Sequence, residues 1–445
     1  MQVFAYKMCN FLKKVFQCPR NYLHISFFCS TFAVKIHCFM KKLLTIAIMA
    51  AMSVTAMGQN EVKADTTAAQ KDSIEGFQFT TIDSIAITPV KDQNRSSTCW
   101  AFSTLGFLES EVLRTKGITL DLSPMYVVSK TMIDRATYCV RLYNEPHFAP
   151  GGSAYDVIYC MSHYGLVPRD VMPGIRYGWT ANDTLPVHAE LDKVASGYLK
   201  GLTGLKKISP VWREGLQAIY DTYLGKCPET FDFNGKKYTP KSFVDYLGLR
   251  EEDYVSITSY THHPFYEKFA LEVPDNWRMD QMYNVPMEDM MRIIDNALAN
   301  GYTLAWAADV SEIGFTRKGI GVVPDDDHGA DITGSDMAKW VGMSNDKKKE
   351  ELTKKPLPEK TITQQMRQDA FDNWENTDDH GMQIFGTAHD QNGKRYYMIK
   401  NSWGTMRSDY KGIWYVSEAY MQYKTNDILV HKNAIPKDIR KKLGL

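Results

Sequence analysis

The stretch that decides the fold is KDQNRSSTCWAFS, residues 91–103, in which Gln93 stands six residues before Cys99. Apolar residues recur at helical spacing after the cysteine and predict a helix from Cys99 onward, with Ser97 or Thr98 as its cap. These residues are Phe102, Leu105, Leu108 or Glu109, and Val112. A cysteine at a helix N-terminus meets the positive end of the helix dipole, which lowers the pKa of its thiol. Cys99 is therefore a candidate nucleophile.

A hairpin signal towards the other end of the chain supplies the partners that such a nucleophile needs. The run MQIFGTAHDQNGKRYYMIKNSWG, residues 382–404, has two apolar stretches around Asn392-Gly393, and Asn-Gly strongly favours a hairpin. His380 precedes the first stretch and Asn401 follows the second, so antiparallel pairing would make them neighbours. Asn401 could then orient the imidazole of His380, which exchanges protons with the thiol.

Gln93 is the fourth candidate, because its side-chain NH2 can face an oxyanion together with the Cys99 backbone N–H. Taken singly, each candidate has a more ordinary interpretation: a core cysteine, a solvated loop histidine, a strand-terminating asparagine and a loop glutamine. Short motifs also transfer poorly between families. Their joint occurrence in this order, flanked by Trp100 and Trp403, favours catalysis.

The remaining pattern places helices first and strands later, which predicts an α+β architecture. A glycine turn and a second helix are expected in residues 151–165, and a further helical piece in 287–299. Polar loops are expected around residues 324–329 and 344–355, and strands in 412–417 and 427–432.

Four segments together resemble the landmark segments of papain-like cysteine peptidases: QNRSSTCWAFS, GGSAYDVI, HGMQIFGTA and IKNSWG. His380 lies 281 residues beyond Cys99, far more than the ~130–150 of a minimal papain-like domain. The long region between them resembles the bleomycin hydrolase/aminopeptidase C branch, and the similarity extends from about Ile82 onward. It implies a papain-like two-lobe α+β fold, with a helical lobe, an antiparallel β-barrel-like lobe, and a long mixed insertion between the Cys and His segments.

The same resemblance implies roles for individual residues. The catalytic set is Cys99 as nucleophile, His380 as general base and acid, Asn401 as its orienter, and Gln93 in the oxyanion hole. Gly151 and Gly152 would form the flat backbone edge that pairs with an extended substrate, and Trp403 would shield the His–Asn pair. In this branch a terminal carboxylate in the cleft holds the free α-amino group of the substrate, which assigns that role to Leu445.

The implied activity is that of a cysteine-type aminopeptidase, acting on peptides through a thioester acyl-enzyme without a metal or organic cofactor. A papain-like endopeptidase and a catalytically silent binding or assembly scaffold are the alternatives. The branch also implies a homo-hexamer with active sites facing an internal channel. Two features depart from the pattern. Ser96-Ser97-Thr98 replaces the usual Cys-Gly-Ser, and the chain ends NAIPKDIRKKLGL without the tail of well-known members.

The first 58 residues differ in charge from the rest of the chain. They hold seven Lys or Arg and no acidic residue, so 45 of the 52 basic residues remain from Gln59 onward against 52 acidic ones, a balance of −7. Residues 40–58 have the basic, apolar and small-residue order of a signal peptide, with cleavage after Gly58. The apolar run of 15 residues is short for a membrane span of ~20. Export to the periplasm or medium is therefore expected, with no membrane association after cleavage.

These observations give the expected domain organisation. Residues 1–39 are a spurious N-terminal extension, 40–58 the signal peptide and 59–80 a flexible N-terminus. Residues 81–445 form the peptidase domain, with the helical lobe in 81–166, the insertion in 167–376, and the β lobe and C-terminal tail in 377–445.

Two further clusters have the composition of binding sites for other ligands. His262-His263 and residues 325–328 contain metal-ligand residue types, but neither has the spacing of a metal motif. Solvated loops are the preferred interpretation, and no metal site is expected. The basic residues within 437–442 are few in a chain of net negative charge, so no nucleic-acid partner is expected.

Overall fold

The computed structural model describes residues 76–143, 147–179, 184–325 and 344–445. The predicted extension at 1–39 and signal peptide at 40–58 lie outside the described residues, as do 59–75 of the predicted flexible N-terminus and 326–328 of the acidic cluster. The described end of that N-terminus is ordered. Phe77 is buried and packs edge-on against Tyr396 at a centroid distance of 6.0 Å. The prediction of flexibility up to residue 80 is therefore wrong for its last residues.

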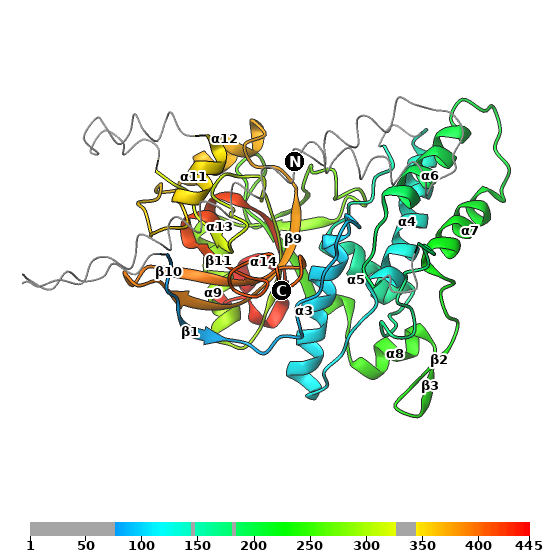
Figure 1. Ribbon diagram of the computed structural model, residues 1–445, viewed down its shortest axis with the longest axis horizontal. Helices are drawn as coiled ribbons and strands as arrows, with labels where there is room; N and C mark the ends of the chain where they lie inside the picture. The colour runs from blue at the N-terminus through cyan, green and yellow to red at the C-terminus, as the bar shows by residue number, and fades with distance from the viewer. Residues whose placement is uncertain (1–75, 144–146, 180–183, 326–343) are drawn as a thin grey trace, which may run out of the picture. The chain divides into compact units, whose positions relative to one another are not determined.

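The helices α3 to α8 pack around one apolar core and form the helical lobe (Figure 1). Their bounds are α3 (Cys99–Lys116), α4 (Pro124–Arg141), α5 (Ala154–His163), α6 (Ala189–Leu202), α7 (Trp212–Leu224) and α8 (Pro240–Leu247). The short strands β2 (Phe231–Phe233) and β3 (Lys236–Tyr238) pair beside α8. The predicted helices at 99 onward and in 151–165 are confirmed. Because α6 to α8 share this core, the helical lobe extends past the predicted boundary at 166.

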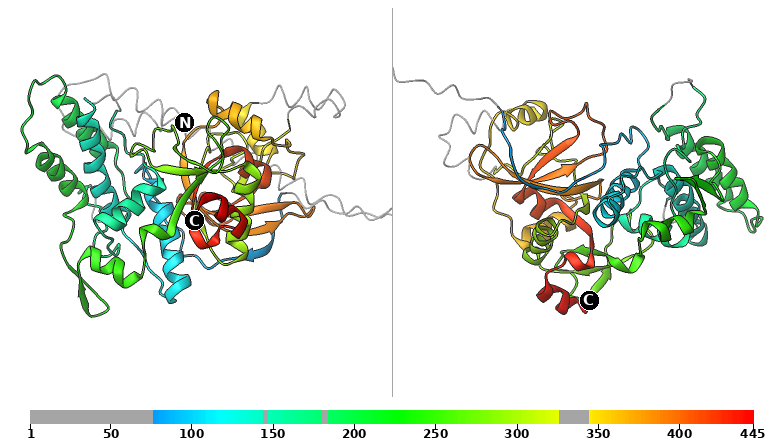
Figure 2. Two further views of the ribbon diagram at one scale, coloured as in Figure 1. Left: turned by 180° about the vertical axis from the view of Figure 1, so that it is seen from behind. Right: turned by 90° about the horizontal axis from the view of Figure 1, so that it is seen from below.

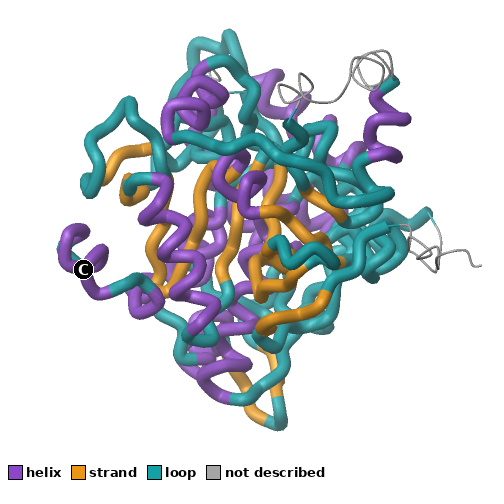
Figure 3. Tube along the Cα trace, turned by 90° about the vertical axis from the view of Figure 1, so that its left-hand side faces the viewer, coloured by secondary structure: helices purple, strands orange, loops and turns teal. Residues whose placement is uncertain are grey.

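The described strands outside that hairpin form one ten-stranded mixed sheet. The strands are β1 (Thr80–Ser84), β4 (Tyr254–Thr258), β5 (Lys268–Ala270), β6 (Gln281–Asn284), β7 (Leu304–Ala308), β8 (Ile320–Gly321), β9 (His380–His389), β10 (Arg395–Lys400), β11 (Ile413–Ser417) and β12 (Thr425–His431). Their order is β5-β6-β4-β12-β7-β9-β10-β11-β8, and β1 pairs with the far half of β9. Figure 3 shows these strands running side by side. The pairs β4–β6 and β8–β11 are parallel and the others antiparallel.

This sheet crosses the predicted boundary at residue 377. Strands β4 to β8 come from the region predicted as an insertion, yet they lie in the same sheet as β9 to β12. The α+β prediction is confirmed, but the insertion is not a separate body. Pairing between β12 and β4, which are more than 160 residues apart, depends on tertiary packing and leaves no local sequence signal.

Several helices cover the sheet: α9 (Met287–Ala299), α11 (Asn345–Glu351), α12 (Gln364–Asp372), α13 (Glu418–Lys424) and α14 (Lys437–Leu443), with the 3₁₀ turns η1 (Glu251–Asp253) and η3 (Lys432–Ala434). The predicted helix at 287–299 is confirmed. The loop predicted at 344–355 is wrong, because α11 forms there. Its first turn carries Asp346 and its last turn carries lysines, a distribution that suits the helix dipole.

Helix α3 lies between the two lobes, as the view from below shows (Figure 2). Every residue from Trp100 to Val112 is buried, because α5 contacts one side of the helix while β7 and β9 contact another. At Gly381 on β9 an added Cβ would lie 2.7 Å from Ser103 Oγ. The sheet and the helix that begins with Cys99 are therefore in direct contact. In the part of the chain that the structure describes, no helix is long and apolar enough to cross a membrane.

Candidate active site

Cys99 is the first residue of α3, as the sequence predicts. The loop before it is strained, since Asn94 and Ser97 have φ angles of 46° and 55° in the left-handed region. Thr98 occupies the N-cap position without making a side-chain cap hydrogen bond, and its hydroxyl lies 2.6 Å from that of Ser96. The predicted position of the cap is therefore confirmed, but its predicted hydrogen bond is absent.

The hairpin β9–β10 brings His380 and Asn401 together. His380 is the first residue of β9, and Asn401 directly follows β10. The Nε2 of His380 lies 2.8 Å from Asn401 Oδ1, which also accepts a hydrogen bond from the Ser402 backbone N–H at 2.7 Å. Because Asn401 is 1% exposed and cannot rotate freely, it holds the ring in one orientation. Its carbonyl oxygen makes Nε2 the protonated nitrogen, so Nδ1 is the nitrogen left to accept a proton.

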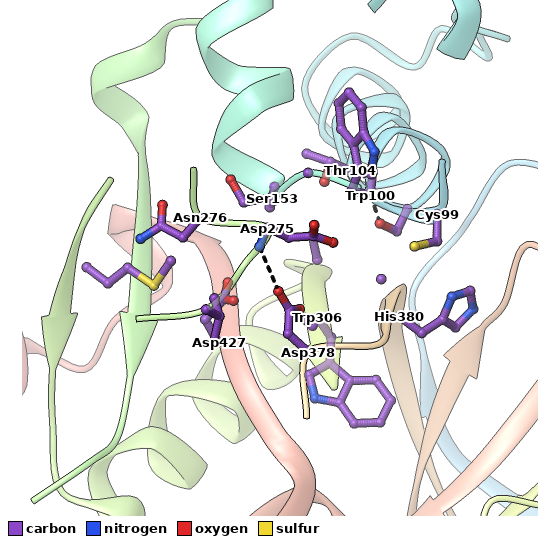
Figure 4. Close-up of a pocket in the computed structure, with 18 residues that line it drawn as sticks. Cys99, Trp100, Thr104, Ser153, Asp275, Asn276, Trp306, Asp378, His380 and Asp427 are labelled. Carbon is purple, nitrogen blue, oxygen red and sulfur yellow. Dashed lines mark hydrogen bonds between the residues drawn. The ribbon is translucent and has the colours of Figure 1, made fainter. Parts of the chain in front are cut away.

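Cys99 and His380 line the same small cavity, of about 30 Å³, between the lobes (Figure 4). Trp100 and Gly152 come to it from the helical lobe, and Ala305 to Ala307 from β7 of the sheet. A thiol, a basic imidazole and an orienting amide in one small cavity can perform nucleophilic acyl transfer.

Trp403 covers the histidine. Its ring lies 4.6 Å from the His380 ring at an interplanar angle of 27°, and packs edge-on against Trp414 at 5.4 Å. This is the arrangement expected of a shield over the His–Asn pair, because a flat apolar ring keeps water from competing for the hydrogen bond.

Gln93 lies beside Asn401 and is not among the residues that line this cavity. Its side-chain Oε1 accepts a hydrogen bond from Ser402 Oγ at 2.6 Å, and its backbone N–H donates to the Ser402 carbonyl at 2.8 Å. Since the oxygen of the amide is occupied, the NH2 group is the free end of the side chain. The role of this group as an oxyanion donor therefore stays a prediction.

The electrostatics of the pair differ from the sequence-based prediction. Burial, aided by the charges of Asp275 and Asp378, raises the pKa of Cys99 to about 12, against hydrogen bonds from the Gly381 and Trp100 backbones. Burial also lowers the pKa of His380 to about 4. The predicted lowering of the thiol pKa is thus outweighed by desolvation. Both groups are neutral at pH 7 in this arrangement, and the proton moves between them when substrate is bound.

The predicted substrate edge at Gly151 and Gly152 is already occupied within the chain. The Gly151 carbonyl accepts a hydrogen bond from Arg135, and the Gly152 backbone N–H donates to Asp275. Backbone groups that are satisfied in this way have no free partner for a substrate strand.

Leu445 does not line the cavity that holds Cys99. Helix α14 is held against α9 by the ion pair of Asp438 with Arg292 and by the burial of Ile439 and Leu443. The chain then ends with the Leu445 N–H bonded to the Arg440 carbonyl. The structure therefore does not bring Leu445 into the lining of the Cys99 cavity, and its role at the substrate amino group stays a prediction.

The structure also adds residues that the sequence analysis missed. Glu272 lies within hydrogen-bond distance of both His262 and His263, at 3.1 and 3.2 Å, so these histidines have a carboxylate partner within the chain. Asp275 and Asp427 join Asp378 in the lining of the active-site cavity. Asp378 is two residues before His380 in the sequence, so its position near the site could be expected. Nothing in the sequence predicts that Asp275 and Asp427, which come from distant segments, lie near it.

Comparisons with known proteins agree with this geometry. The family model described as "Peptidase C1-like family" matches residues 35–328 and 332–444. Aminopeptidase G of Lactobacillus delbrueckii subsp. lactis is 23% identical over 386 residues, which cover 78% of this chain and 82% of the relative. Aminopeptidase C of Streptococcus thermophilus is 23% identical over 391 residues, covering 77% and 80%. The crystal structure of PepW from Lactobacillus rhamnosis HN001 has a TM-score of 0.60 at 19% identity, covering 82% and 84%, and shares the fold.

Proposed function

The chain belongs to the Peptidase C1-like family, and we propose that it is a cysteine aminopeptidase of the bleomycin hydrolase type that removes N-terminal residues from peptides. The observation that carries the peptidase assignment is the contact of His380 Nε2 with Asn401 Oδ1 beside Cys99 in one cavity. The aminopeptidase names of the full-length relatives support the exopeptidase assignment.

Cys99 and His380 account for each proton in the reaction. The Cys99 sulfur attacks the carbonyl carbon of the first peptide bond while its proton passes to His380 Nδ1. The resulting oxyanion receives hydrogen bonds from the Cys99 backbone N–H and from the Gln93 NH2 group. His380 then protonates the leaving amine, and the C–N bond breaks to give a thioester. Water attacks the thioester, its proton passes through His380 to the departing sulfur, and the free amino acid leaves.

The test is to assay the full chain and Cys99→Ala on matched fluorogenic peptides with free and acetylated N-termini. Wild type is expected to cleave the free-amine peptides, and Cys99→Ala is expected to be inactive. Equal cleavage of both peptide types by wild type would instead favour an endopeptidase. Inactivity of wild type and variant alike, on a broad set of N-terminal residues, would favour a binding scaffold.

Export and assembly are part of the same proposal. The segment at 40–58 supports secretion with cleavage after Gly58, and N-terminal sequencing of the native protein tests this. A mature chain that retains residues before Met40 would contradict it. The hexamer implied by the family branch is tested by light scattering of the purified protein, where a monomer mass would contradict it.

A further inference from the structure

A segment that we name the strap, residues 271–280 between β5 and β6, crosses from the sheet to the helical lobe. Arg278 binds Asp156 through Nε at 2.6 Å and Asp134 through an Nη at 2.7 Å. Trp277 Nε1 donates to Asp156 at 3.1 Å. Asp156 is fully buried and also accepts from the Ser153 backbone at the start of α5. The strap is therefore anchored firmly beside the active-site cavity.

The strap places Asp275 on the glycine edge. The Gly152 N–H donates to the Asp275 carboxylate, and a Cβ added at Gly151 would lie 2.0 Å from Asp275 Oδ1. This N–H is the group that the family pattern assigns to the backbone of an upstream substrate residue. The Asp275 carboxylate therefore lies against the glycine edge, in the lining of the cavity that also holds Cys99. A peptide that continues upstream has no edge to pair with there.

The lining of the cavity around Asp275 contains three carboxyl groups and no Lys or Arg among the described residues. Asp275, Asp378 and Asp427 line it together with Cys99, as Figure 4 shows. Arg135 Nη1 lies 3.6 Å from Asp275 Oδ1. Among the described residues, no Lys or Arg forms an ion pair with Asp378 or Asp427. A cationic ligand in this cavity would therefore meet two carboxyl groups that have no Lys or Arg partner among the described residues.

The pKa values of these carboxyls show what an incoming cation would change. Burial raises the pKa of Asp275 to about 6 and that of Asp427 to about 7, and it raises the pKa of Asp378 well above its ordinary value. A buried carboxyl without a compensating charge prefers its neutral form, and an incoming cation reverses that preference.

A second and independent feature points to a ligand in the same cavity. Thr104, on α3 beyond Cys99, is 0% exposed, and its hydroxyl has no hydrogen-bond partner among the described residues. Thr104 is among the residues that line the cavity. Buried polar groups normally have a hydrogen-bond partner, and a polar ligand in this cavity would supply one.

We propose that Asp275, supported by Asp378 and Asp427, binds the free α-ammonium group of the peptide substrate next to Cys99. This inference rests on the proposed aminopeptidase function and adds the group that selects free N-termini. Side-chain carboxylates from the strap and the sheet perform here the task that the family pattern assigns to the end of the chain. An ammonium group has three N–H donors, and the oxygens of the three carboxylates can accept hydrogen bonds from them.

The inference is tested with the full chain and the isosteric variants Asp275→Asn, Asp378→Asn and Asp427→Asn. We expect Asp275→Asn to lower kcat/KM for free-amine peptides by more than about tenfold, mainly through KM, since a hydrogen bond to a charged group is lost. Cleavage of acetylated peptides is expected to stay the same or to increase. Glu272→Gln, on the same strap but exposed and outside the cavity, is the matched control with unchanged kinetics.

A binding measurement separates this inference from the proposed activity. Leucinamide is expected to protect Cys99 of wild type from iodoacetamide, whereas N-acetyl-leucinamide is not, and Asp275→Asn is expected to lose this difference. Equal protection by both amides, no protection by either, or wild-type behaviour of all three aspartate variants would overturn the inference. Absence of peptide cleavage with selective protection by leucinamide would contradict the proposed activity alone. Thermal unfolding of each variant verifies that it is folded.

Discussion

At the scale of single residues, Cys99 and His380 illustrate a competition between local and tertiary electrostatics. The helix N-terminus favours a thiolate at Cys99. Burial between the lobes and the carboxyls of Asp275 and Asp378 favour the neutral thiol, and in the structure they prevail. The hydrogen bond from His380 to Asn401 and the cover of Trp403 then hold the imidazole where it can receive the proton.

The raised pKa of Cys99 predicts the pH dependence of its alkylation in the free enzyme. Because the thiol is protonated below a pKa of about 12, the thiolate fraction rises about tenfold per pH unit across the neutral range. The second-order rate of iodoacetamide alkylation is therefore expected to increase steadily from pH 6 to pH 9, with Cys99→Ala correcting for other thiols. A plateau beginning near pH 5 would show that a thiolate–imidazolium pair outweighs burial.

At the scale of secondary structure elements, the contact between α3 and β9 determines the distance between nucleophile and base. Gly381 follows His380 and packs against the first turn of α3, where a side chain would lie 3.3 Å from Trp100 Cα. The absence of a Cβ at this position allows the helix and the strand to approach each other closely. Catalysis therefore depends on a glycine at this position because it has no side chain.

Gly381→Ala is expected to push α3 away from β9, because its Cβ would lie 2.7 Å from Ser103 Oγ. The expected cost is about 1–3 kcal/mol of stability and about a 10- to 100-fold loss in kcat/KM. Steady-state kinetics and urea unfolding measure both effects, and Ser103→Ala in the same chain should recover part of them. The matched control is Gly197→Ala in α6, where nothing lies within 4 Å and stability should rise by about 0.5–1 kcal/mol. Unchanged kinetics in Gly381→Ala would contradict this account.

At the scale of the described chain from residue 76 onward, loops of the helical lobe contact the loop that precedes Cys99. One of them links the loop before Cys99 to the helical lobe through His188, whose backbone N–H donates to the Arg95 carbonyl at 3.0 Å. The His188 ring is 1% exposed, and its Nε2 has no partner among the described residues. Burial lowers its pKa to about 4. His188 is therefore kept neutral in the folded protein.

The lowered pKa of His188 predicts a loss of stability in acid. Between pH 6.5 and about 4 the unfolded chain binds a proton that the folded chain does not, so stability falls as pH decreases through this window. Across the whole window His188 lowers the free energy of unfolding by about 3 kcal/mol, because its pKa differs by about 2.5 between the folded and unfolded chain. His188→Gln, which cannot titrate, is expected to show a shallower fall in unfolding free energy between pH 7 and pH 4 in urea titrations. Equal slopes for variant and wild type would contradict the prediction.

Much of the fold and of the catalytic geometry could be predicted from local patterns. The apolar spacing after Cys99 predicted α3, and the Asn392-Gly393 turn predicted the β9–β10 hairpin. The hairpin in turn predicted the His380–Asn401 contact, because antiparallel pairing joins the ends of adjacent strands whatever surrounds them. These features depend on residues near one another in the sequence or on a single turn.

The lobe boundaries, the strap and the ionisation of the site depended on contacts between distant segments. Short strands such as β4 and β7 found their partners only in the assembled sheet, and the charged run of α11 resembled a polar loop. Asp275, Asp378 and Asp427 come from three separate segments, so their proximity to Cys99 exists only after folding. The sequence alone determined which residues could react. The tertiary structure decided how deeply they are buried, and burial sets their charge because it removes the water that would stabilise an isolated ion.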